Sequence, residues 1–555
     1  MSTNTALIAD KRGLPLVGNH TPSPGWQSIP DTIAFDPAGI QAKLLDLDQP
    51  CYVLNLQGRR GVVHADDLQQ VSTSGSEPEI ILALPPLPMQ QLGDPDFQAT
   101  YGLRYAYAAG AMAGGIASAD LVIALGQAGM LGSFGAGGLA PDRIATAINR
   151  IQQALPQGAY AFNLIHSPND PALERKAVEL YLQYGVKTVE ASAFLDLTAN
   201  IVYYRAAGLS LNATQQIEIR HKVIAKLSRS EVAAKFLQPA PTHLLKELLA
   251  QGLITEQQAH LAQQVPMADD ITVEADSAGH TDNRPLVCLL PAILSLRDTT
   301  QAQYGYARSV RVGAAGGIGT PESAIAALTM GAAYIVTGSI NQSCIEADTS
   351  EQTKNLLAQA EMTDVMMAPA ADMFEMGVRL QVLKRGTLFP VRAQKLYDLY
   401  RNYDSIESIP PTERAQIEKQ IFRKSLDAVW QETIAFFQQR DPAQLEKVTN
   451  HPKRKMALIF RSYLGLSSRW SNTGEPGREI DYQIWCGPTM GAFNAWVKDS
   501  YLADPKQRQV VDVAHHILRG AAFLQRLQSL QIQGLRLPPP YTRYHPQPMD
   551  ISKLG

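Results

Sequence analysis

The sequence lacks the features that mark secreted, disulfide-rich and zinc-binding proteins. Its 555 residues contain only four cysteines, at positions 51, 288, 344 and 486, and these form neither a Cys-x-x-Cys pair nor a cluster with histidines. A disulfide framework and a zinc site are therefore not expected, and we predict no bound metal. We expect the cysteines to be reduced thiols, mostly buried.

Long apolar runs and an excess of charge of one sign are also missing. No apolar segment reaches the roughly 20 residues that a membrane helix needs, so we expect no membrane partner. The polar stretch Met1–Gly18 lacks an apolar signal region, which indicates a cytoplasmic protein. A net charge of −3 gives no electrostatic reason to expect nucleic acid as a partner.

The order of strand and helix patterns predicts three parts. Residues 1–95 read as a small β-containing domain, with strand patterns at Tyr52–Leu56 and Glu79–Leu84 before the proline-rich break Pro85–Pro88. Strand and helix patterns alternate over residues 96–350, whereas residues 351–555 are mostly helical in pattern. In that last part we expect helices over Ala370–Arg385, Ala393–Tyr400, Glu413–Phe437 and Val510–Gln531.

The middle part contains eight strand candidates, each followed by a helix or a long connection. This count predicts an α/β fold, a (β/α)8 TIM barrel. A doubly wound open sheet would alternate in the same way, but no Gly-x-Gly-x-x-Gly follows an early strand with an acidic residue about 20 positions further on. The strand candidates are Leu103–Ala108, Leu131–Phe134, Ala159–Ile165, Lys187–Ala191, Lys222–Leu227, Ile271–Ala275, Ser309–Ala314 and Tyr334–Thr337.

A long helical insertion, residues 230–268, separates the fifth and sixth strand candidates. An insertion that follows a barrel strand is expected on the catalytic face, which makes this segment a candidate lid or a platform for a partner. A purely structural decoration is the alternative.

One histidine follows the sixth strand candidate. The strand Ile271–Ala275 leads through small residues to His280, at the mouth of the predicted barrel. A lone histidine is more often structural than catalytic, but the near-neutral pKa of imidazole makes it a natural proton donor at pH 7. We therefore predict that His280 is catalytic.

The last two strand candidates end in small residues that predict a phosphate site. Gly316-Gly317 follows the seventh strand and Gly338-Ser339 follows the eighth. In such barrels the loops after these two strands commonly bind phosphate, because glycine lets the backbone approach the phosphate oxygens. Thr337 could add a hydroxyl donor. Glycines that serve only tight turns are the alternative.

Two further segments suit the flat ring of FMN. The first strand candidate ends in Gly110, Ala111 and Met112, which leave room for a ring beside the backbone, although helix packing is an alternative interpretation. Asn163, at the end of the third strand candidate, carries an amide that offers both a donor and an acceptor to the pyrimidine edge of a flavin.

Several motifs resemble those of the nitronate monooxygenase and FMN-dependent enoyl-ACP reductase superfamily. They are Glu274–Pro285 (Glu-Ala-Asp-Ser-Ala-Gly-His-Thr-Asp-Asn-Arg-Pro), the run Ala-Ala-Gly-Gly-Ile-Gly and the run Val-Thr-Gly-Ser. Three more, Val265–Val273, Met367–Val378 and Trp485–Asn494, resemble the PfaD family. Its members are trans-acting enoyl reductases of polyunsaturated fatty acid synthases and trans-acyltransferase polyketide synthases. The resemblance covers most of the chain.

This resemblance implies a flavin barrel that reduces an α,β-unsaturated acyl thioester held on an acyl carrier protein, with FMN and NADPH as cofactors. Carrier-protein domains of a polyunsaturated fatty acid or polyketide synthase are the implied partners, and we expect a homodimer. Carried over by motif, the catalytic histidine is His280 and the cofactor-binding residues are Gly110, Ala111, Met112, Asn163, Gly279, Gly316, Gly317, Gly338 and Ser339. One departure is Ala278, where relatives often carry glycine; alanine requires that this position avoid a positive φ.

Two other functions stay open. A nitronate monooxygenase would use the same flavin with oxygen as the electron acceptor. A non-catalytic docking subunit of a megasynthase would retain no flavin. The long part after the predicted barrel favours the reductase, because a small soluble substrate needs no such platform.

Overall fold

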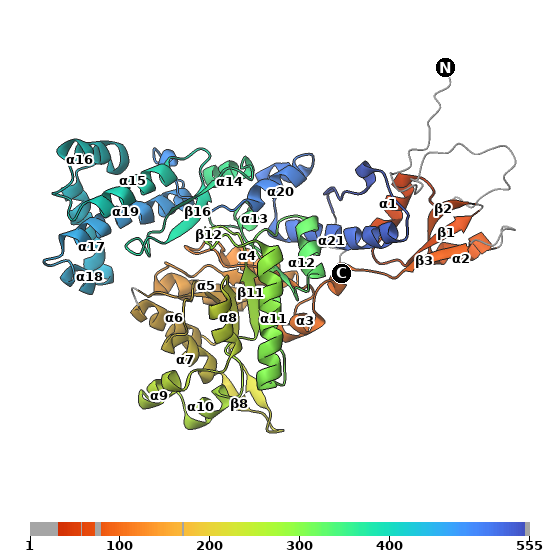
Figure 1. Cartoon of the computed structure of the whole chain (residues 1–555), viewed down its shortest axis with the longest axis horizontal. Coiled ribbons are helices and arrows are strands. Elements are labelled where there is room, and N and C mark those ends of the chain that lie inside the picture. Colours follow the sequence, from red (N-terminus) through yellow and green to blue (C-terminus); the bar gives the residue numbers. More distant parts are fainter. Residues whose placement is uncertain (1–31, 57, 73–78, 169–170, 550–555) are drawn as a thin grey trace, which may run out of the picture.

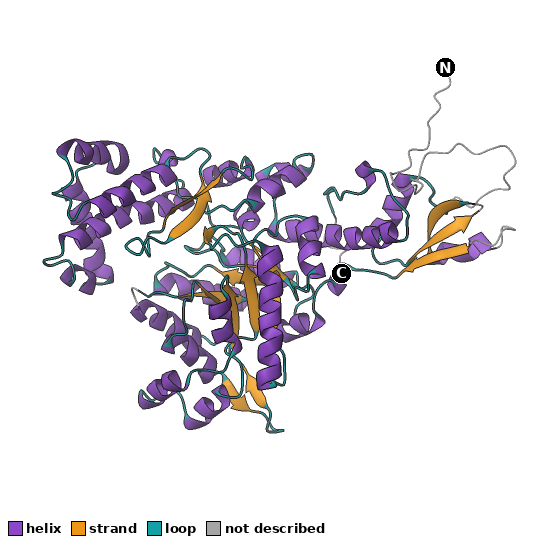
Figure 2. Ribbon diagram, viewed as in Figure 1, coloured by secondary structure: helices purple, strands orange, loops and turns teal. Residues whose placement is uncertain are grey.

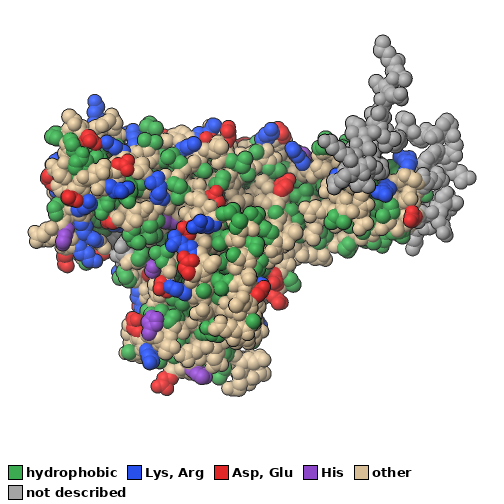
Figure 3. Space-filling view, viewed as in Figure 1, with side chains coloured by type: hydrophobic (Ala, Val, Ile, Leu, Met, Phe, Trp, Pro, Cys, Tyr) green, Lys and Arg blue, Asp and Glu red, His purple; other side chains and the backbone are tan. Residues whose placement is uncertain are grey.

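The molecule has a T-shaped outline, with a barrel below a long horizontal arm (Figure 1). The structure is a computed structural model that describes residues 32–56, 58–72, 79–168 and 171–549, so the prediction for Met1–Gly18 lies outside the described residues. On the face drawn in Figure 3, basic and acidic side chains are interspersed. None of the described helices is both long and apolar enough to cross a bilayer.

Eight parallel strands close into a barrel, which confirms the predicted fold class (Figure 2). The order around the barrel is β10-β11-β13-β14-β4-β5-β6-β7, and the pairing of Val336 with Ala108 brings the last strand beside the first. The strands are β4 (Tyr107–Ala109), β5 (Leu131–Phe134), β6 (Ala161–Ile165), β7 (Thr188–Ser192), β10 (Lys222–Leu227), β11 (Asp270–Glu274), β13 (Arg311–Ala315) and β14 (Ile335–Thr337). The largest difference from the sequence prediction is at the first strand, which begins at Tyr107 rather than Leu103.

Helices surround the barrel and begin where the sequence offers starting residues. Proline occupies the first turn of α5 and α12, where its missing N–H breaks no helical hydrogen bond. Thr320 and Ser323 form a reciprocal capping box before α12. The barrel helices are α4 (Ala119–Gln127), α5 (Pro141–Ala154), α6 (Pro171–Gln183), α7 (Ala199–Ala207), α8 (Ser230–Leu237), α11 (Leu286–Tyr304), α12 (Pro321–Thr329) and α13 (Ser339–Gln342).

A polar cluster closes the amino-terminal end of the barrel. Helix α3 (Pro95–Tyr101) brings the Tyr101 hydroxyl to Asp270, to which it donates a hydrogen bond of 2.5 Å. Arg311 donates to the same carboxylate from two nitrogens, at 2.7 and 2.9 Å. Because these charges are paired and hydrogen-bonded, their burial is tolerated. Since the cluster fills the amino-terminal end, the open end of the barrel is the carboxyl end.

The helical insertion lies at the amino-terminal end of the barrel, away from the catalytic face. Gln258 donates from Nε2 to the carbonyl of Ala207, the last residue of α7, and Arg205 donates to the carbonyl of Pro266 at 2.9 Å. Figure 1 shows α9 and α10 at the lower tip of the molecule, beside β8. These elements are β8 (Leu209–Leu211), β9 (Ile217–Ile219), α9 (Thr242–Ala250) and α10 (Glu256–Ala262).

The expectation that residues 230–268 lie on the catalytic face, as a lid or partner platform, was therefore wrong, and the alternative of a structural decoration remains. Helix α8 follows β10 as an ordinary barrel helix and carries the chain back along the barrel. What remains of the insertion then starts at the amino-terminal end, because a barrel helix runs antiparallel to its strand.

A small antiparallel sheet forms the amino-terminal unit, at the far end of the arm (Figure 2). Its strand order is β2-β1-β3, and β1 shifts register between Val53 and Leu54. The long helix α21 reaches this unit and bonds it through Arg526. The elements are α1 (Pro37–Leu45), β1 (Cys51–Leu56), β2 (Arg59–His64), α2 (Ala65–Ser72) and β3 (Glu79–Leu84).

The region after the barrel is mostly helical, as predicted, but it contains a β-hairpin over the barrel mouth. Strands β15 (Val365–Pro369) and β16 (Arg379–Leu383) pair antiparallel, so the helix predicted over Ala370–Arg385 was wrong. The short strand β12 (Gly279–His280) pairs with β16. The helices are α14 (Glu351–Ala358), α15 (Phe389–Asn402), α16 (Pro411–Ile417), α17 (Leu426–Arg440), α18 (Ala443–Glu446), α19 (Pro452–Thr473), α20 (Thr489–Val497) and α21 (Val510–Ile532). Division of the chain at residues 95 and 350 stays a prediction.

Candidate functional site

All the site residues predicted from the sequence lie at the carboxyl end of the barrel. Most of them lie in the loops after β4, β13 and β14 or in β12, and Asn163 lies in the middle of β6. Catalytic residues of barrel enzymes occupy this rim, because the loops there vary without disturbing the strands. The barrel and its C-terminal hairpin therefore enclose one candidate site.

The ends of β13 and β14 form a corner suited to an anion. A Cβ on Gly316 would lie 2.6 Å from the carbonyl carbon of Ala275, so glycine is needed there for close approach to the end of β11. Gly317 has a φ of +79°, and a Cβ on Gly317 or Gly338 would meet nothing within 4 Å. The N–H groups of Gly317 and Ser339 donate to no described residue. Free N–H groups beside open space fit a phosphate group.

Two hydroxyl groups at this corner differ in availability. Ser339 Oγ accepts a hydrogen bond of 3.2 Å from the N–H of Gly487, which leaves its own proton free to donate. The Thr337 hydroxyl is buried and bonded to the Tyr107 hydroxyl at 2.6 Å and to the Asn341 amide at 2.9 Å. The expected donor role of Thr337 at the phosphate was therefore wrong.

The loop after β4 is fixed by a second glycine-rich loop, after β5. The N–H of Gly115 donates to the Gly135 carbonyl at 2.9 Å, and the N–H of Gly114 donates to the Gly137 carbonyl at 2.7 Å. A Cβ on Gly135 would lie 1.7 Å from the carbonyl oxygen of Met112, so only glycine fits. The sequence analysis missed this second loop, although its three glycines, at positions 135, 137 and 138, were a visible signal.

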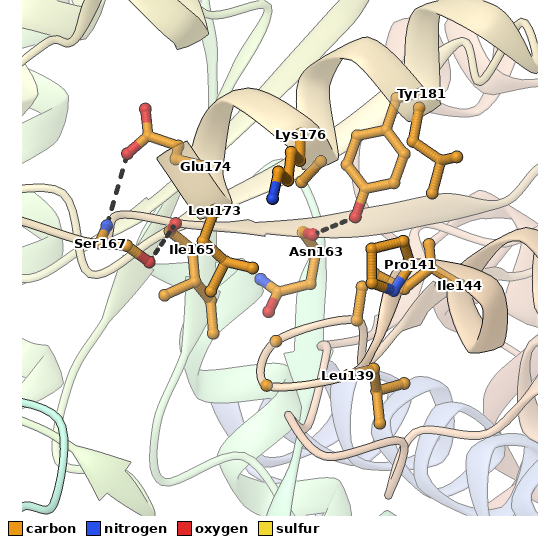
Figure 4. A pocket seen from close by; sticks show the side chains of 15 residues that line it. Leu139, Pro141, Ile144, Asn163, Ile165, Ser167, Leu173, Glu174, Lys176 and Tyr181 are labelled. Carbon is orange, nitrogen blue, oxygen red and sulfur yellow. Dashed lines mark hydrogen bonds between the residues drawn. The ribbon is translucent and has the colours of Figure 1, made fainter. Parts of the chain in front are cut away.

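Asn163 offers less than the sequence analysis expected. Its Nδ2 already donates to the Glu190 carbonyl at 3.2 Å and to the Ser192 hydroxyl, so only Oδ1 remains to accept from a ligand. The residue is buried and borders a cavity of about 60 Å³ between α5 and α6. Figure 4 shows the Tyr181 hydroxyl bonded to the backbone oxygen of Asn163, with Lys176 projecting from the same helix, α6. A ring N–H would suit the free oxygen.

Three charged side chains meet inside the carboxyl end of the barrel. Lys226 Nζ lies 3.4 Å from Glu190 Oε1 and 3.3 Å from Glu274 Oε1. Burial by itself would lower the pKa of Lys226, but the two carboxylates outweigh it and raise the pKa, so the lysine is charged. Glu190 also accepts the N–H of Ala111 at 3.2 Å. That contact crosses the barrel and supports the loop after β4.

Sequence analysis missed Glu190 and Lys226 and assigned Glu274 no role. A signal was present, since each is a charged residue in the second half of a strand candidate. Such a residue either points into the barrel with a partner or disrupts the strand.

His280 lies at the mouth and is paired with a carboxylate from the C-terminal hairpin. Its Nε2 is 3.1 Å from Asp372 Oδ1, and its side chain is 32% exposed. Burial lowers the pKa of His280, but the hydrogen bond and charge of Asp372 outweigh burial and raise it. Gly279 takes a positive φ of +72° and Ala278 does not, so the loop accommodates alanine.

The C-terminal region holds the His280 loop from above. Gln381 Nε2 donates at 2.8 Å both to Asp276 Oδ1 and to the Ser277 carbonyl. A Cβ on Gly279 would lie 3.9 Å from the Trp485 ring. Since these partners are separated from the loop by about a hundred residues or more, no local sequence pattern could identify them.

The site combines three chemical capacities. It offers an anion corner, a backbone-lined loop with room for a flat ring, and an imidazole held by a carboxylate at the mouth. Together these can bind a phosphorylated ring cofactor such as FMN and donate a proton to a molecule lying over it.

Comparisons with protein families find three matches in this chain. The family described as nitronate monooxygenase matches residues 102–401, and the N-terminal domain of the fatty acid synthase protein PfaD matches residues 26–86. The inserted helical domain of acyl-carrier-protein S-malonyltransferase matches residues 403–482.

Curated relatives belong to lipid and polyketide synthases. The chain is 50% identical over 521 residues to a polyunsaturated fatty acid synthase protein of Thraustochytrium sp.. This match covers 91% of this chain and 34% of that protein. It is 46% identical over 444 residues to the polyketide biosynthesis protein PksE of Bacillus subtilis, covering 80% of this chain and 58% of that protein. This chain thus spans less than two thirds of either relative.

One solved structure is similar over its whole length. The enoyl reductase domain of MlnA, from the macrolactin biosynthesis cluster of Bacillus amyloliquefaciens, superposes with a TM-score of 0.76 at 39% identity. The match covers 80% of this chain and 100% of that domain, so it extends beyond the barrel into the flanking regions.

Proposed function

Because this chain belongs to the nitronate monooxygenase family and carries a PfaD N-terminal domain, we propose that it is a flavin-dependent enoyl reductase. Its substrate is an α,β-unsaturated acyl thioester on an acyl carrier protein, in polyunsaturated fatty acid or polyketide biosynthesis. The observation that carries the proposal is the 39% identity to an enoyl reductase domain over that domain's full length. We further propose synthase carrier domains as partners, a homodimeric assembly and a cytoplasmic location.

The proposed cofactors are FMN and NADPH. The FMN phosphate would lie against Gly316-Gly317 and Gly338-Ser339, and its ring against Gly110–Met112 and Gly279. The free Oδ1 of Asn163 would accept the ring N–H. When bound, FMN would supply the hydride-transfer chemistry that links NADPH to the substrate β-carbon.

The chain's own part in the chemistry falls to His280. Hydride addition at the β-carbon builds negative charge on the thioester oxygen, and the α-carbon then requires a proton. Since Nε2 faces Asp372, the nitrogen that remains for the substrate is Nδ1, which bonds no described residue. From there the imidazole can donate a hydrogen bond to the thioester oxygen or give its proton to the α-carbon.

A spectrum and two turnover assays test the proposal. The purified protein should be yellow, release FMN on heating and consume NADPH when given a crotonyl thioester on a carrier protein. Colourless protein that also fails to take up added FMN would indicate a docking subunit. The family match itself favours a second candidate, nitronate monooxygenase activity, which would appear as oxygen-dependent consumption of a small alkyl nitronate without NADPH.

A further inference from the structure

We propose that Asp372, from the C-terminal hairpin, is a positioning residue that keeps His280 in the doubly protonated form required for proton donation. This inference rests on the proposed enoyl reduction. It adds to the reaction a residue outside the barrel and gives the C-terminal region a part in the chemistry.

The hydrogen-bond geometry sets which nitrogen can act. A carboxylate only accepts, so Nε2 of His280 must carry a hydrogen toward Asp372 Oδ1 at 3.1 Å. A neutral ring with its hydrogen on Nε2 has a bare lone pair on Nδ1 and can donate nothing to substrate. Proton donation from Nδ1 therefore requires the imidazolium, the form that an adjacent carboxylate stabilises.

Both partners of this pair are held in place by backbone structure. His280 pairs with Leu380 of β16, so the histidine is part of the same small sheet as the hairpin that carries Asp372. Asp372 itself lies in the turn between β15 and β16, where its Oδ1 also accepts the N–H of Met373 at 3.1 Å. The distance between the two side chains thus depends on the hairpin and not on barrel loops alone.

The helices of the C-terminal region anchor that turn. Phe374 is fully buried, with ring centroids 5.4 Å from Tyr397 and 5.2 Å from Tyr400 on α15. Glu375 pairs with Arg461 of α19 at 3.1 Å. Two consecutive residues of the turn that carries Asp372 are therefore fixed to two helices, which limits how far its carboxylate can move.

Other charges near His280 act in both directions. Glu274 raises the pKa of the imidazole and Lys226 lowers it, whereas Asp372 provides both a direct hydrogen bond and a charge. The acid form exists below the folded-state pKa and is lost as pH rises through it. Removal of Asp372 should therefore move the alkaline limit of activity to lower pH.

The test is the pH profile of enoyl reduction by Asp372→Asn holoenzyme. A decrease of one unit in the pKa of His280 reduces the protonated fraction on the alkaline side about tenfold. We expect kcat/KM at pH 8 to fall about tenfold or more, with a smaller loss at pH 6, and Asp372→Glu to recover part of the activity. FMN content and flavin reduction by NADPH should stay at the wild-type level. Asp398→Asn, an exposed acid-to-amide change on α15, is the matched control.

A double mutant separates positioning from a merely structural role. In a His280→Ala background, Asp372→Asn should cause no further loss, because its effect acts through the imidazole. An unchanged pH profile in the single mutant, or an additive loss in the double mutant, would overturn the inference. If wild-type protein fails to reduce enoyl thioesters at all, the proposed function fails instead, so the two failures are distinguishable.

Discussion

Neighbouring glycines at the barrel mouth have different reasons to be glycine. Gly316 allows two strand ends to approach each other, whereas Gly317 borders open space. A substitution at Gly317 can therefore test ligand binding, because a side chain there would occupy space beside the loop without changing how the strands pack. A substitution at Gly316 would disturb the strands themselves.

Replacement of Gly317 by valine should abolish FMN retention while the barrel stays folded. The side chain would project into the space proposed for the phosphate, and the φ of +79° adds local strain. The ratio of flavin to protein absorbance measures retention, and circular dichroism measures folding. Gly252→Val is the matched control, because Gly252 has a φ of +70° and equally open surroundings but lies on the insertion. Undiminished flavin in the Gly317 variant would reject the phosphate assignment.

His280→Ala should separate the two half-reactions. We expect FMN content and its reduction by NADPH to be retained, while transfer to the enoyl thioester slows about 10²–10⁴-fold, as expected for loss of a general acid. Stopped-flow absorbance follows each half-reaction on its own. His260→Ala, an exposed histidine at the other end of the barrel, should behave as wild type. If the oxidative half-reaction stayed within a few-fold of wild type, the proton source would be another group.

Among the elements, the C-terminal hairpin and the helical insertion differ most from what the sequence suggested. The segment after β10 was expected over the mouth and lies at the far end, while the segment 365–383 was expected to be partly helical and forms the sheet over the mouth. In the hairpin, strand β16 gains its hydrogen bonds from β12 and β15, and such tertiary pairing overrides a weak local helix preference.

Helix α21 is buried on nearly all sides and contains a histidine without hydrogen-bond partners. His515 is 3% exposed, and neither ring nitrogen bonds a described residue. Burial, with a smaller effect from the charge of Arg104, lowers the pKa of His515 to about 4. In the unfolded chain the His515 imidazole binds a proton near pH 6.5, whereas in the folded protein it binds one only near pH 4. Stability should therefore fall as pH drops through this window.

His515→Phe should reduce this acid sensitivity. The wild type is expected to lose up to about 3 kcal/mol from His515 between about pH 7.5 and pH 4.5, and the variant should lack that contribution. Urea unfolding at the two pH values gives the difference. Gln525→Phe, an exposed change on the same helix that removes no titratable group, is the control. Equal acid-induced losses in the His515 variant and the wild type would contradict the assignment.

At the scale of the whole molecule, one arginine connects the two ends of the chain. Arg526 on α21 is buried, and its guanidinium donates to backbone carbonyls of the amino-terminal unit. The carbonyls are those of Leu44, Asp46, Leu47, Gln49 and Pro85. A planar group with five N–H donors suits such a cluster, and a lysine could not reach all of it.

Arg526→Ala should loosen the amino-terminal unit from the rest of the molecule. Several buried carbonyls would lose their donors, which should cost about 3 kcal/mol or more. Urea unfolding and limited proteolysis near residues 85–95 would report the loss, and Arg526→Lys should be intermediate. Arg519→Ala, which removes a single bond to the Leu45 carbonyl from the same helix, is the control. Equal stability of the two alanine variants would show that the cluster does not hold the unit.

The sequence by itself determined the barrel strands and the rim residues, because both depend on short-range patterns. Short apolar runs between helix patterns predict buried strands, and a strand followed by glycine or histidine places that residue on the rim once the fold is a barrel. Gly317, Ser339 and His280 could be identified in this way.

Only the tertiary structure decided which side chains meet across the mouth. Asp372 lies 92 residues from His280, and Glu190 supports Ala111 from across the barrel. Such contacts depend on the position at which each helix brings the chain back to the barrel and on which strand edge is left free to pair. Spacing in the sequence carries no information about either, since hydrogen bonds between distant segments follow from packing and not from local period.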